Sequence, residues 1–387
     1  MIFEHRHDPL RVVIAGGGVA ALEALLALRD LAPGRVAPVL IADQEDFLYR
    51  PLLVGEPFGL GRPRRHRLAD LCADHGAELI AGRVTAVAPG DHQVAIAGRA
   101  PVDYDELIVA TGARPYPAFE DGVTFDRDLS GEEFDEALAD LAHGLAPHVA
   151  IVVPTGVGWT LPAYELALLT AAWGARHHAD EHRVTLLTPE RAPLEAFGAA
   201  ASREVGALLD AAGVALFPGV HADVVTASSL RAGGSWMDAD RIVSLPLQAG
   251  PRIAGLPCDE HGFIPSDARG RVAGVDDVHV AGDAGTFAVK QGGLAAQQAE
   301  AVAVDLARRA GALVAQVPSP RVLRGVLLTE HGPRFLRAEL GDPDGTSELS
   351  AQPLWWPPTK IASRRLAPYL ARLEAEGRGP GAVAMRT

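Results

Sequence analysis

The sequence has few residues that could form a redox pair or hold a metal ion. It contains only two cysteines, Cys72 and Cys258, which form neither a Cys-x-x-Cys pair nor a cluster with metal-ligand spacing. The fourteen histidines show no metal spacing either, and we expect His177, His178 and His182 on an exposed helix end. These features predict inert thiols in a reducing compartment and no metal site.

Positive charge and long apolar stretches are also scarce. The formal net charge is −14, which argues against nucleic acid as a partner. No stretch approaches the roughly 18 apolar residues needed to cross a bilayer. Residues 1–9 are polar, so no signal peptide is predicted. We expect a cytoplasmic protein, with a peripheral position on the inner membrane face as the alternative.

The beginning of the chain has the order of a dinucleotide-binding module. Residues 10–15 form a short apolar run rich in β-branched side chains, which predicts a buried parallel strand. Three glycines, a helical pattern and a second apolar run at 38–42 follow. A strand, a glycine turn, a helix and a strand within about thirty residues form a β-α-β unit.

The glycine turn has the features of a phosphate-binding loop. Gly16 permits the tight turn, Gly18 lets the backbone approach a pyrophosphate, and the small Ala21 lets helix and strand pack closely. The helix N-terminus adds free N–H groups and partial positive charge. Asp43 ends the second strand and can accept hydrogen bonds from ribose hydroxyls, with Glu45 as the alternate.

Two later motifs indicate FAD rather than NAD. Thr111 and Gly112 close a strand in an Ala-Thr-Gly motif. Gly282 and Asp283 close another strand in an Ala-Gly-Asp motif that leads into a helix. Asp283 can hydrogen-bond a ribityl hydroxyl, and the N-terminus of the following helix can point at the flavin or pyrophosphate.

Together these motifs resemble the two-dinucleotide-binding-domain flavoproteins, the pyridine nucleotide–disulfide oxidoreductase superfamily. The chain is most similar to the branch of sulfide:quinone oxidoreductases, flavocytochrome c sulfide dehydrogenase flavoprotein subunits and type II NADH dehydrogenases. The similar segments are residues 12–24, 47–53, 107–115, 163–169 and 278–300. The resemblance covers residues 10 to 320 approximately.

The resemblance implies an α/β fold with two Rossmann-type domains, the second inserted in the first. The FAD-binding domain is expected at 1–116 and 270–318, the NAD(P)-binding-like domain at 117–269, and a small C-terminal α+β region at 319–387. The positions expected to bind FAD are Gly16, Gly18, Ala21, Asp43, Arg50, Val84, Thr111, Gly112, Gly282, Asp283, Lys290, Gln291 and Gly292.

Three further positions are candidates for chemistry beside the flavin. A cation at Lys290 would stabilise the anionic reduced flavin, unless it is a surface lysine. Glu165 matches a glutamate near the flavin of type II NADH dehydrogenases and could relay protons, unless it only bonds within its helix. Gln297, with Gln298, matches a helix that borders the quinone pocket of similar reductases, unless it lies on a solvated face.

The second unit, residues 148–190, keeps the strand order but alters the glycine fingerprint. Gly156 and Gly158 hold the first two places, whereas Leu161 stands where a small residue is needed. A leucine there would push helix and strand apart, so NAD(P)H binding is disfavoured. Glu190 could serve a ribose or be a solvated acid at a strand end.

The same loop lacks a redox cysteine that sulfide-oxidising relatives need. Trp159 and Leu161 hold the candidate places, so a redox disulfide is disfavoured. We predict an FAD-dependent oxidoreductase that takes electrons from a small-molecule donor and passes them through the flavin alone, with a quinone as candidate acceptor. The alternatives are an NAD(P)H dehydrogenase that uses the second domain, a sulfide:quinone oxidoreductase-like variant without redox cysteines, and a non-catalytic flavin-binding sensor or assembly partner.

The C-terminal tail, from residue 354 onward, combines aromatic and basic side chains. They are Trp355, Trp356, Lys360, Arg364, Arg365 and Tyr369. This combination suits a membrane interface, and the C-terminal region carries the membrane contact in the similar quinone reductases. Because the tail is proline-rich and short of apolar residues, a cap over the flavin domain or a homodimer surface is favoured instead.

Overall fold

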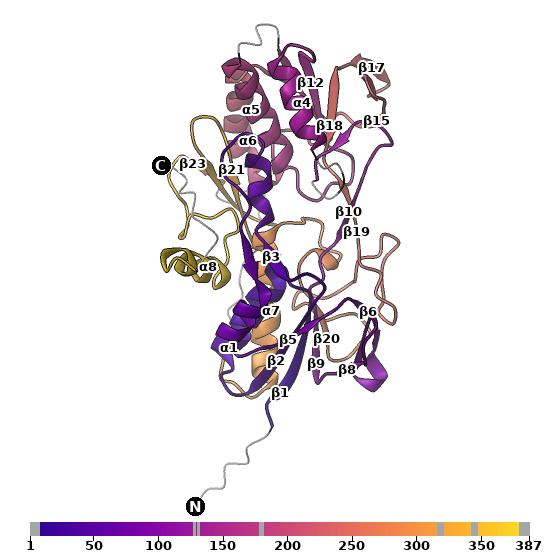
Figure 1. Ribbon diagram of the computed structural model, residues 1–387, viewed down its shortest axis with the longest axis vertical. Helices are drawn as coiled ribbons and strands as arrows, with labels where there is room; N and C mark the ends of the chain where they lie inside the picture. The colour runs from indigo at the N-terminus through magenta and orange to yellow at the C-terminus, as the bar shows by residue number, and fades with distance from the viewer. Residues whose placement is uncertain are drawn as a thin grey trace, which may run out of the picture.

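The computed structural model describes residues 8–126, 129, 132–177, 182–315, 321–341 and 347–378. Two parallel sheets lie at opposite ends of an elongated molecule (Figure 1). The chain passes from the first sheet to the second and back again before it forms the C-terminal region. His178, one of the three histidines expected on a helix end, lies outside the described residues.

The first sheet is five-stranded and parallel, in the order β20-β9-β1-β2-β5. Its strands are β1 (Leu10–Ala15), β2 (Val36–Ala42), β5 (Glu78–Ala81), β9 (Glu106–Val109) and β20 (Val278–Val280). The edge strand β20 pairs with β9. In the chain, β20 comes after all strands of the second sheet. The segment between β9 and β20 contains the second parallel sheet.

Both faces of the first sheet are covered, which explains why the inner strands β1 and β2 are largely apolar. Val12 and Ile14 pack beneath the helices α1 (Val19–Leu31) and α7 (Gly292–Arg309). Val13 and Ala15 point to the opposite face, against the antiparallel sheet of β6 (Val84–Ala88), β7 (Gln93–Ile96) and β8 (Val102–Asp103).

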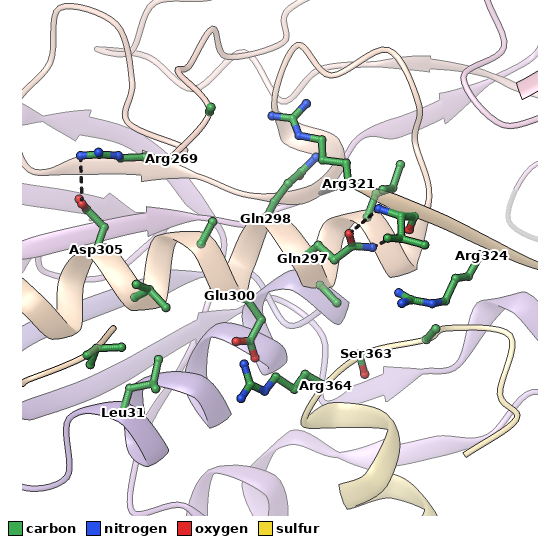
Figure 2. Close-up of a pocket in the computed structure, with 18 of the residues that line it drawn as sticks. Leu31, Arg269, Gln297, Gln298, Glu300, Asp305, Arg321, Arg324, Ser363 and Arg364 are labelled. Carbon is green, nitrogen blue, oxygen red and sulfur yellow. Dashed lines mark hydrogen bonds and ion pairs between the residues drawn. The ribbon is translucent and has the colours of Figure 1, made fainter. Parts of the chain in front are cut away.

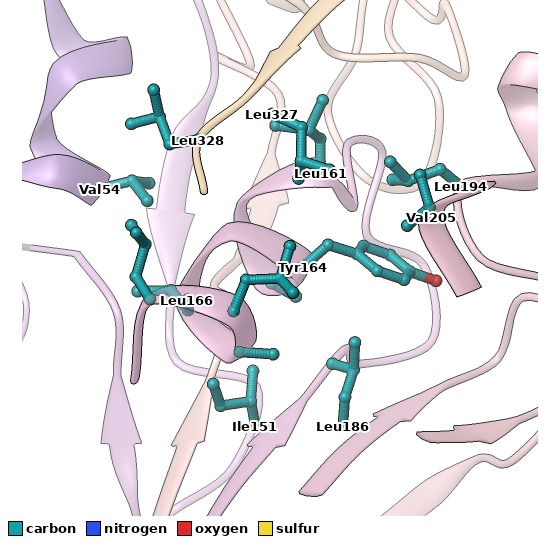
Figure 3. Packing of buried hydrophobic residues seen from close by; sticks show 14 of the residues in the cluster. Val54, Ile151, Leu161, Tyr164, Leu166, Leu186, Leu194, Val205, Leu327 and Leu328 are labelled. Carbon is teal, nitrogen blue, oxygen red and sulfur yellow. The ribbon is translucent and has the colours of Figure 1, made fainter. Parts of the chain in front are cut away.

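The second sheet is also five-stranded and parallel, in the order β11-β18-β12-β13-β14. Its strands are β11 (Val123–Thr124), β12 (His148–Val152), β13 (Arg183–Thr188), β14 (Val214–Pro218) and β18 (Arg241–Ser244). Helices α4 (Glu133–Ala142), α5 (Leu161–Arg176) and α6 (Gly198–Ala211) supply the core on one face. Figure 3 shows Tyr164 of α5 among Leu186, Leu194 and Val205 in this core. The antiparallel strands β15 (Ala222–Val225), β16 (Ser229–Ala232) and β17 (Ser235–Asp238) cover the other face.

Two antiparallel strands, β10 (Arg114–Tyr116) and β19 (Leu247–Ala249), join the modules where the chain leaves the first and returns from the second. These observations confirm the predicted α/β fold with two dinucleotide-binding domains. The domain limits stay a prediction. The remaining short elements are β3 (Asp46–Leu48), β4 (Arg65–Arg67), α2 (Leu68–Asp74) and the 3-10 turns η1 (Arg50–Gly55), η2 (Pro89–Asp91), η3 (Glu195–Phe197) and η4 (Gly282–Ala284).

The C-terminal region packs against both modules. The antiparallel sheet of β21 (Val322–Leu327), β22 (Arg334–Glu339) and β23 (Glu348–Ser350) contributes Leu323 and Phe335 to the core of the second module. Helix α8 (Leu366–Ala375) packs on the first module, where Leu366 and Leu370 join the core beside α1. None of the helices in the described ranges is long and apolar enough to cross a membrane.

A buried carboxylate anchors the tail to the first module. Glu23 of α1 is fully buried and accepts backbone N–H hydrogen bonds from Arg364, Arg365 and Leu366, at 3.1, 2.9 and 2.7 Å. These N–H groups lie at the start of helix α8, so a carboxylate from helix α1 caps the N-terminus of α8. Tyr369 adds a hydrogen bond of 2.7 Å to Asp74. The backbone at residues 364–366 and the Tyr369 hydroxyl thus hold the tail to the first module.

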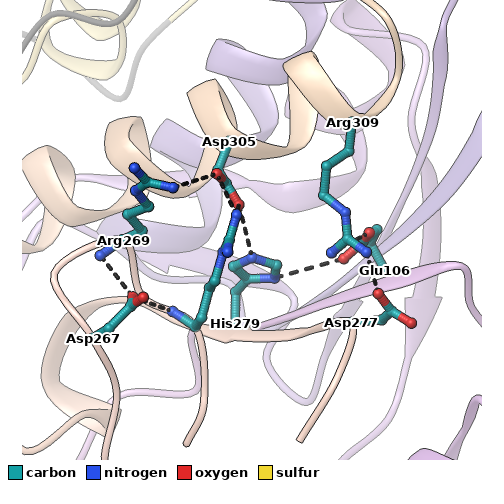
Figure 4. A network of polar contacts seen from close by, with 8 residues as sticks. Glu106, Asp267, Arg269, Asp277, His279, Asp305 and Arg309 are labelled. Atoms are coloured by element: carbon teal, nitrogen blue, oxygen red, sulfur yellow. Dashed lines mark hydrogen bonds and ion pairs between the residues drawn. The ribbon is translucent and has the colours of Figure 1, made fainter.

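A second buried polar cluster lies where α7 crosses β9 and β20 (Figure 4). Arg309 pairs with Glu106 at 2.7 Å, and the buried ring of His279 lies 3.7 Å from Glu106 and 3.6 Å from Asp305. Burial raises the pKa of Glu106 to about 7, against the opposing effect of Arg309.

Glu106→Gln should make the stability less dependent on pH. Because the native pKa of Glu106 is above its unfolded value, the carboxyl favours folding most at low pH, and that contribution is lost as the pH rises through about 7. We expect the free energy of unfolding to fall by about 1–3 kcal/mol between pH 5 and 8 in the wild type, and by less in the variant. Urea unfolding at both pH values measures this. The exposed Glu78→Gln is the control, and equal pH slopes in Glu106→Gln and wild type would contradict the assignment.

Candidate functional site

The first glycine loop has the backbone geometry of a phosphate cradle. Gly16 has a φ of +126°, and a Cβ there would lie 2.2 Å from the carbonyl oxygen of Ala110, so the loop touches the Ala-Thr-Gly strand. Gly18 is the N-cap of α1 and has no atom within 4 Å of a Cβ position. No side-chain hydrogen bond from the N-cap residue closes this helix end. A pyrophosphate fits this arrangement.

Two helices begin at the same edge of the first sheet. A Cβ on Gly282 would lie 3.1 Å from the Cβ of Ala20 and 3.4 Å from the Cβ of Ala295, so α1 and α7 start side by side there. Their N-terminal partial positive charges therefore add at this edge. Gly112 lies at the end of the neighbouring strand with a φ of +74° and open space at its Cβ position. The structure thus brings Gly16, Gly18, Gly112 and Gly282 together, as expected for FAD.

The acidic residues predicted to bind sugar hydroxyls differ in environment. Asp283 is half-buried, and no residue in the described part of the chain donates a hydrogen bond to its carboxylate, whose pKa is raised by burial. A carboxylate that Lys290 influences only through its charge, and to which no described residue donates a hydrogen bond, fits a ribityl hydroxyl. Asp43 directly follows β2, is exposed, and pairs with Arg83 at 3.1 Å. Val84 follows Arg83 as the first residue of β6.

Lys290 lies inside the fold and is not a surface lysine. Its Nζ donates hydrogen bonds to the backbone oxygens of Asp283, at 3.1 Å, and Gly285, and it lies 3.8 Å from the ring centre of Phe263. Burial lowers the pKa of Lys290 to about 8, while Asp283 opposes that shift. The ammonium group is therefore held beside the Ala-Gly-Asp motif.

A cavity of about 280 Å³ separates the two modules. It brings together five residues predicted from sequence, namely Arg50, Glu165, Lys290, Gln291 and Gly292. The second module adds Trp159 and Pro162, and the tail adds Lys360 and Ile361. Neither cysteine lines it, because Cys72 is buried in α2 and Cys258 is exposed elsewhere.

Two predicted residues are held by other contacts than those expected. Gln291 caps α7 by accepting a hydrogen bond from the Leu294 N–H at 2.8 Å and donates to the Arg324 carbonyl at 3.0 Å. Gln297 does not line the interdomain cavity. It exchanges two hydrogen bonds with the Val322 backbone, of 2.8 and 2.9 Å, and so joins α7 to β21.

A buried ion pair forms one wall of the interdomain cavity. Lys360 Nζ lies 2.6 and 2.8 Å from the two carboxylate oxygens of Glu165, which also accepts the Leu328 N–H at 2.8 Å. Glu165 is fully buried, and burial raises its pKa while Lys360 opposes the shift. The alternative of a bond within the helix is wrong, because all these partners come from the C-terminal region. Sequence reasoning missed Lys360 as a site residue because its partner lies 195 positions away.

The second glycine loop is filled by the chain itself. A Cβ on Gly158 would lie 2.7 Å from Cγ of Lys290 and 2.8 Å from the carbonyl oxygen of Ala288. The Lys290 N–H donates to the Gly158 carbonyl at 3.1 Å. Gly158 therefore permits a close approach between the modules, where the fingerprint would place a pyrophosphate. Leu161 is buried at the start of α5 and packs against Gly325 of β21.

Glu190, at the strand end of the second unit, is neither solvated nor open to a ribose. It is only 9% exposed and accepts hydrogen bonds from the Tyr164 hydroxyl at 2.8 Å and the Thr188 hydroxyl at 3.3 Å. The prediction of a solvated acid is thus wrong. The carboxylate is satisfied within the second module.

The fold and the cradle at Gly16 and Gly18 define a two-module flavoprotein. The family model of the pyridine nucleotide-disulphide oxidoreductases matches residues 10–303. The chain therefore belongs to this family and is an FAD-dependent oxidoreductase. No curated protein sequence is significantly similar to it.

Solved structures share the fold at low identity. The sulfide:quinone oxidoreductase of Aquifex aeolicus is 19% identical with a TM-score of 0.77, over 88% of this chain and 87% of that one. A ferredoxin reductase of Rhodopseudomonas palustris is 20% identical with a TM-score of 0.62, over 86% and 82%. An NAD-dependent persulfide reductase of A. fulgidus is 18% identical with a TM-score of 0.61, over 86% and 64%. At such identities the likeness establishes the fold alone.

Gly18→Val should preserve the fold but weaken FAD binding. The φ of −91° suits any residue and nothing lies near the Cβ position, so the protein itself tolerates the side chain. The branched side chain would occupy the space that the pyrophosphate needs, and we expect FAD affinity to fall at least about tenfold. Titration of FAD into stripped protein, followed by flavin fluorescence, measures this.

Gly90→Val is the matched control, because Gly90 is exposed and also has open space at its Cβ position. If Gly18→Val binds FAD as tightly as the wild type, the loop at Gly16–Gly18 does not contact the cofactor.

Proposed function

We propose that this protein oxidises a small-molecule donor and reduces a quinone at the interdomain cavity, using FAD and no redox disulfide. The observation that carries the proposal is the convergence of Lys290, Gln291 and Gly292 with the buried Glu165–Lys360 pair around one cavity that contains no cysteine.

The lining of the interdomain cavity suits a flat molecule with polar edges. Trp159, Pro162 and Ile361 supply apolar and aromatic surface, which is typical of small-molecule sites. Lys290 and Lys360 supply positive charge where negative charge develops during reduction. A quinone has an apolar ring with two carbonyl oxygens, so it matches both features.

Each basic group has a distinct proposed task. FAD, when bound, supplies the hydride and electron transfer. Lys290, held by two backbone carbonyls, would place its charge beside the flavin ring. Lys360 Nζ would donate a proton to the acceptor oxygen, and Glu165 keeps that lysine charged and oriented.

The NAD(P)H alternative has less support from the second module. Lys290 and Ala288 fill the space at Gly158 where a pyrophosphate would lie. The Glu190 carboxylate already accepts a hydrogen bond from the Tyr164 hydroxyl, so it is not available to a ribose. The sulfide alternative lacks a cysteine at the interdomain cavity. A lipid-soluble quinone would require a peripheral position on the inner membrane face, for which Trp356, 84% exposed, offers an interfacial side chain.

Anaerobic titration of the yellow protein with NADH, NADPH and sulfide tests the donor. We expect no rapid bleaching of the flavin absorbance by either nicotinamide. Protein reduced chemically should be reoxidised rapidly by a soluble quinone, with one quinone consumed per flavin. Rapid bleaching by NADH or NADPH would instead favour the dehydrogenase, and no reoxidation by quinone would contradict the proposed acceptor.

Substitution of the Glu165–Lys360 pair distinguishes its effect on stability from its effect on quinone turnover. Lys360→Gln should lower the free energy of unfolding by about 3–5 kcal/mol, because the buried Glu165 loses its partner. The double variant Glu165→Gln/Lys360→Gln should recover most of that stability, yet reduce quinone turnover about a hundredfold. Urea unfolding and stopped-flow reoxidation measure the two effects. A double variant with wild-type turnover would assign the pair a structural role alone.

A further inference from the structure

Lys290 is held at both ends, and two different parts of the chain hold it. Its Nζ donates hydrogen bonds to the backbone oxygens of Asp283 and Gly285, which follow strand β20 of the first sheet. The ring of Phe263 lies against the same group, with its centre 3.8 Å from Nζ. The backbone N–H of Lys290 donates instead to the Gly158 carbonyl of the second module, at 3.1 Å. The second module therefore holds the base of a side chain whose charged end lies beside the Ala-Gly-Asp motif.

Gly158 lets the base of Lys290 come this close because it has no side chain. A Cβ at Gly158 would lie 2.7 Å from Cγ and 3.2 Å from Cβ of Lys290, and 2.8 Å from the carbonyl oxygen of Ala288. Carbon atoms that pack without strain are about 3.5–4.0 Å apart. The φ of Gly158 is not positive, so the backbone conformation by itself does not require glycine. The packing against segment 288–290 is what requires it.

An apolar contact fixes the same segment to the second module. Val289 precedes Lys290 and packs against the core of that module, together with Val157 and Trp159. These last two residues flank Gly158 in the second glycine loop. The contact at Gly158 is therefore part of a packed interface between the modules. A change in the packing of this interface must move the base of Lys290 as well.

A larger cavity, of about 920 Å³, lies along α7 and is separate from this contact. Figure 2 shows Gln297 and Glu300 of α7 among the residues that line it. Gly158 and Lys290 line the interdomain cavity and not the cavity along α7. Of these two cavities, the contact between Gly158 and Lys290 therefore affects only the interdomain one.

The position of the Lys290 charge matters because a flavin becomes more negative when it is reduced. A positive charge near the ring stabilises the reduced form, and the Coulomb energy falls as the distance between the charges grows. The protein tunes a bound cofactor through charges of this kind, whereas the flavin itself transfers the electrons. Displacement of Lys290 should therefore lower the reduction potential of bound FAD.

We propose that Gly158 is a positioning residue for the flavin: by admitting the base of Lys290, it lets the second module fix the charge that sets the reduction potential of FAD. The loop that carries part of a nucleotide fingerprint thus acts on the cofactor of the first module. This inference rests on the proposed place of Lys290 beside the flavin ring. It does not depend on the identity of the electron donor or on a quinone as the acceptor.

A double-mutant cycle on the flavin-loaded protein tests this, with the two-electron reduction potential as the measured quantity. Anaerobic equilibration with a reference dye gives the potential of each variant. Lys290→Met removes the charge, and we expect the equilibrium constant of flavin reduction to fall about a hundredfold, or about 60 mV. Gly158→Ala should lower it about tenfold, or about 30 mV, because the charge is displaced and not removed.

The double variant Gly158→Ala/Lys290→Met decides whether Gly158 acts through Lys290. If it does, the double variant has the potential of Lys290→Met alone, since no charge is left to displace. Additive shifts would show that Gly158 acts by another route and would overturn the proposal. An unchanged potential in Gly158→Ala, alongside a lowered one in Lys290→Met, overturns it too and leaves the proposed place of Lys290 intact.

Gly206→Ala is the matched control, because Gly206 lies in α6 of the second module and its Cβ position has no atom nearer than 3.9 Å. Its potential should equal that of the wild type. If Gly158→Ala does not retain FAD, Val289→Ala takes its place in the cycle, because it loosens the same segment without a clash. An unchanged potential in Val289→Ala, or shifts that add to those of Lys290→Met, then overturns the proposal.

An unchanged potential in Lys290→Met has a different meaning. It would contradict the proposed place of the Lys290 charge beside the flavin, and the inference on Gly158 would fall with it. Quinone turnover is not measured in this cycle, so the proposed acceptor is tested separately by the reoxidation experiment.

Discussion

The buried ion pair between Glu165 and Lys360 determines how the parts of this protein fit together. A fully buried carboxylate is costly unless it is paired, and here its partners are the Lys360 ammonium of the tail and the Leu328 N–H after β21. The second module, the C-terminal sheet and the tail must therefore all be in place before Glu165 is satisfied. Glu23 links the tail to the first module in a similar way, because it accepts hydrogen bonds from three N–H groups at the start of α8. Two carboxylates thus fix the tail, whose residues Lys360 and Ile361 line the interdomain cavity.

The two glycine loops show how one fold can carry two different sites. At Gly18 the Cβ position faces open space at an uncapped helix end, so the loop can accept a phosphate. At Gly158 the same position is filled by Lys290 and Ala288 of the first module. In the first loop the missing side chain of Gly18 leaves space for a nucleotide phosphate, whereas in the second loop the missing side chain of Gly158 lets the first module pack closely. The second module has therefore become a wall of the interdomain cavity.

Much of the fold followed from local patterns in the chain. The apolar runs, the glycine turn and the strand-end motifs predicted the two parallel modules and the FAD family, because these features depend on neighbouring residues and on the β-α-β order. The site was predicted in part. Arg50, Glu165, Lys290, Gln291 and Gly292 meet at one cavity. For Glu190 the sequence offered a ribose or solvent, whereas its carboxylate bonds to Tyr164, and for Glu165 the sequence offered no partner.

The sequence by itself determined the periodicity, the glycine positions and the absence of paired cysteines, and these suffice for the family and its cofactor. Only the tertiary structure decided which charges are paired. Lys360 pairs with Glu165 across 195 positions, while Arg324 and Arg364 form no ion pair with any carboxylate in the described part of the chain. The physical reason is that pairing and burial depend on contacts between segments far apart in the chain, and no local pattern encodes those contacts.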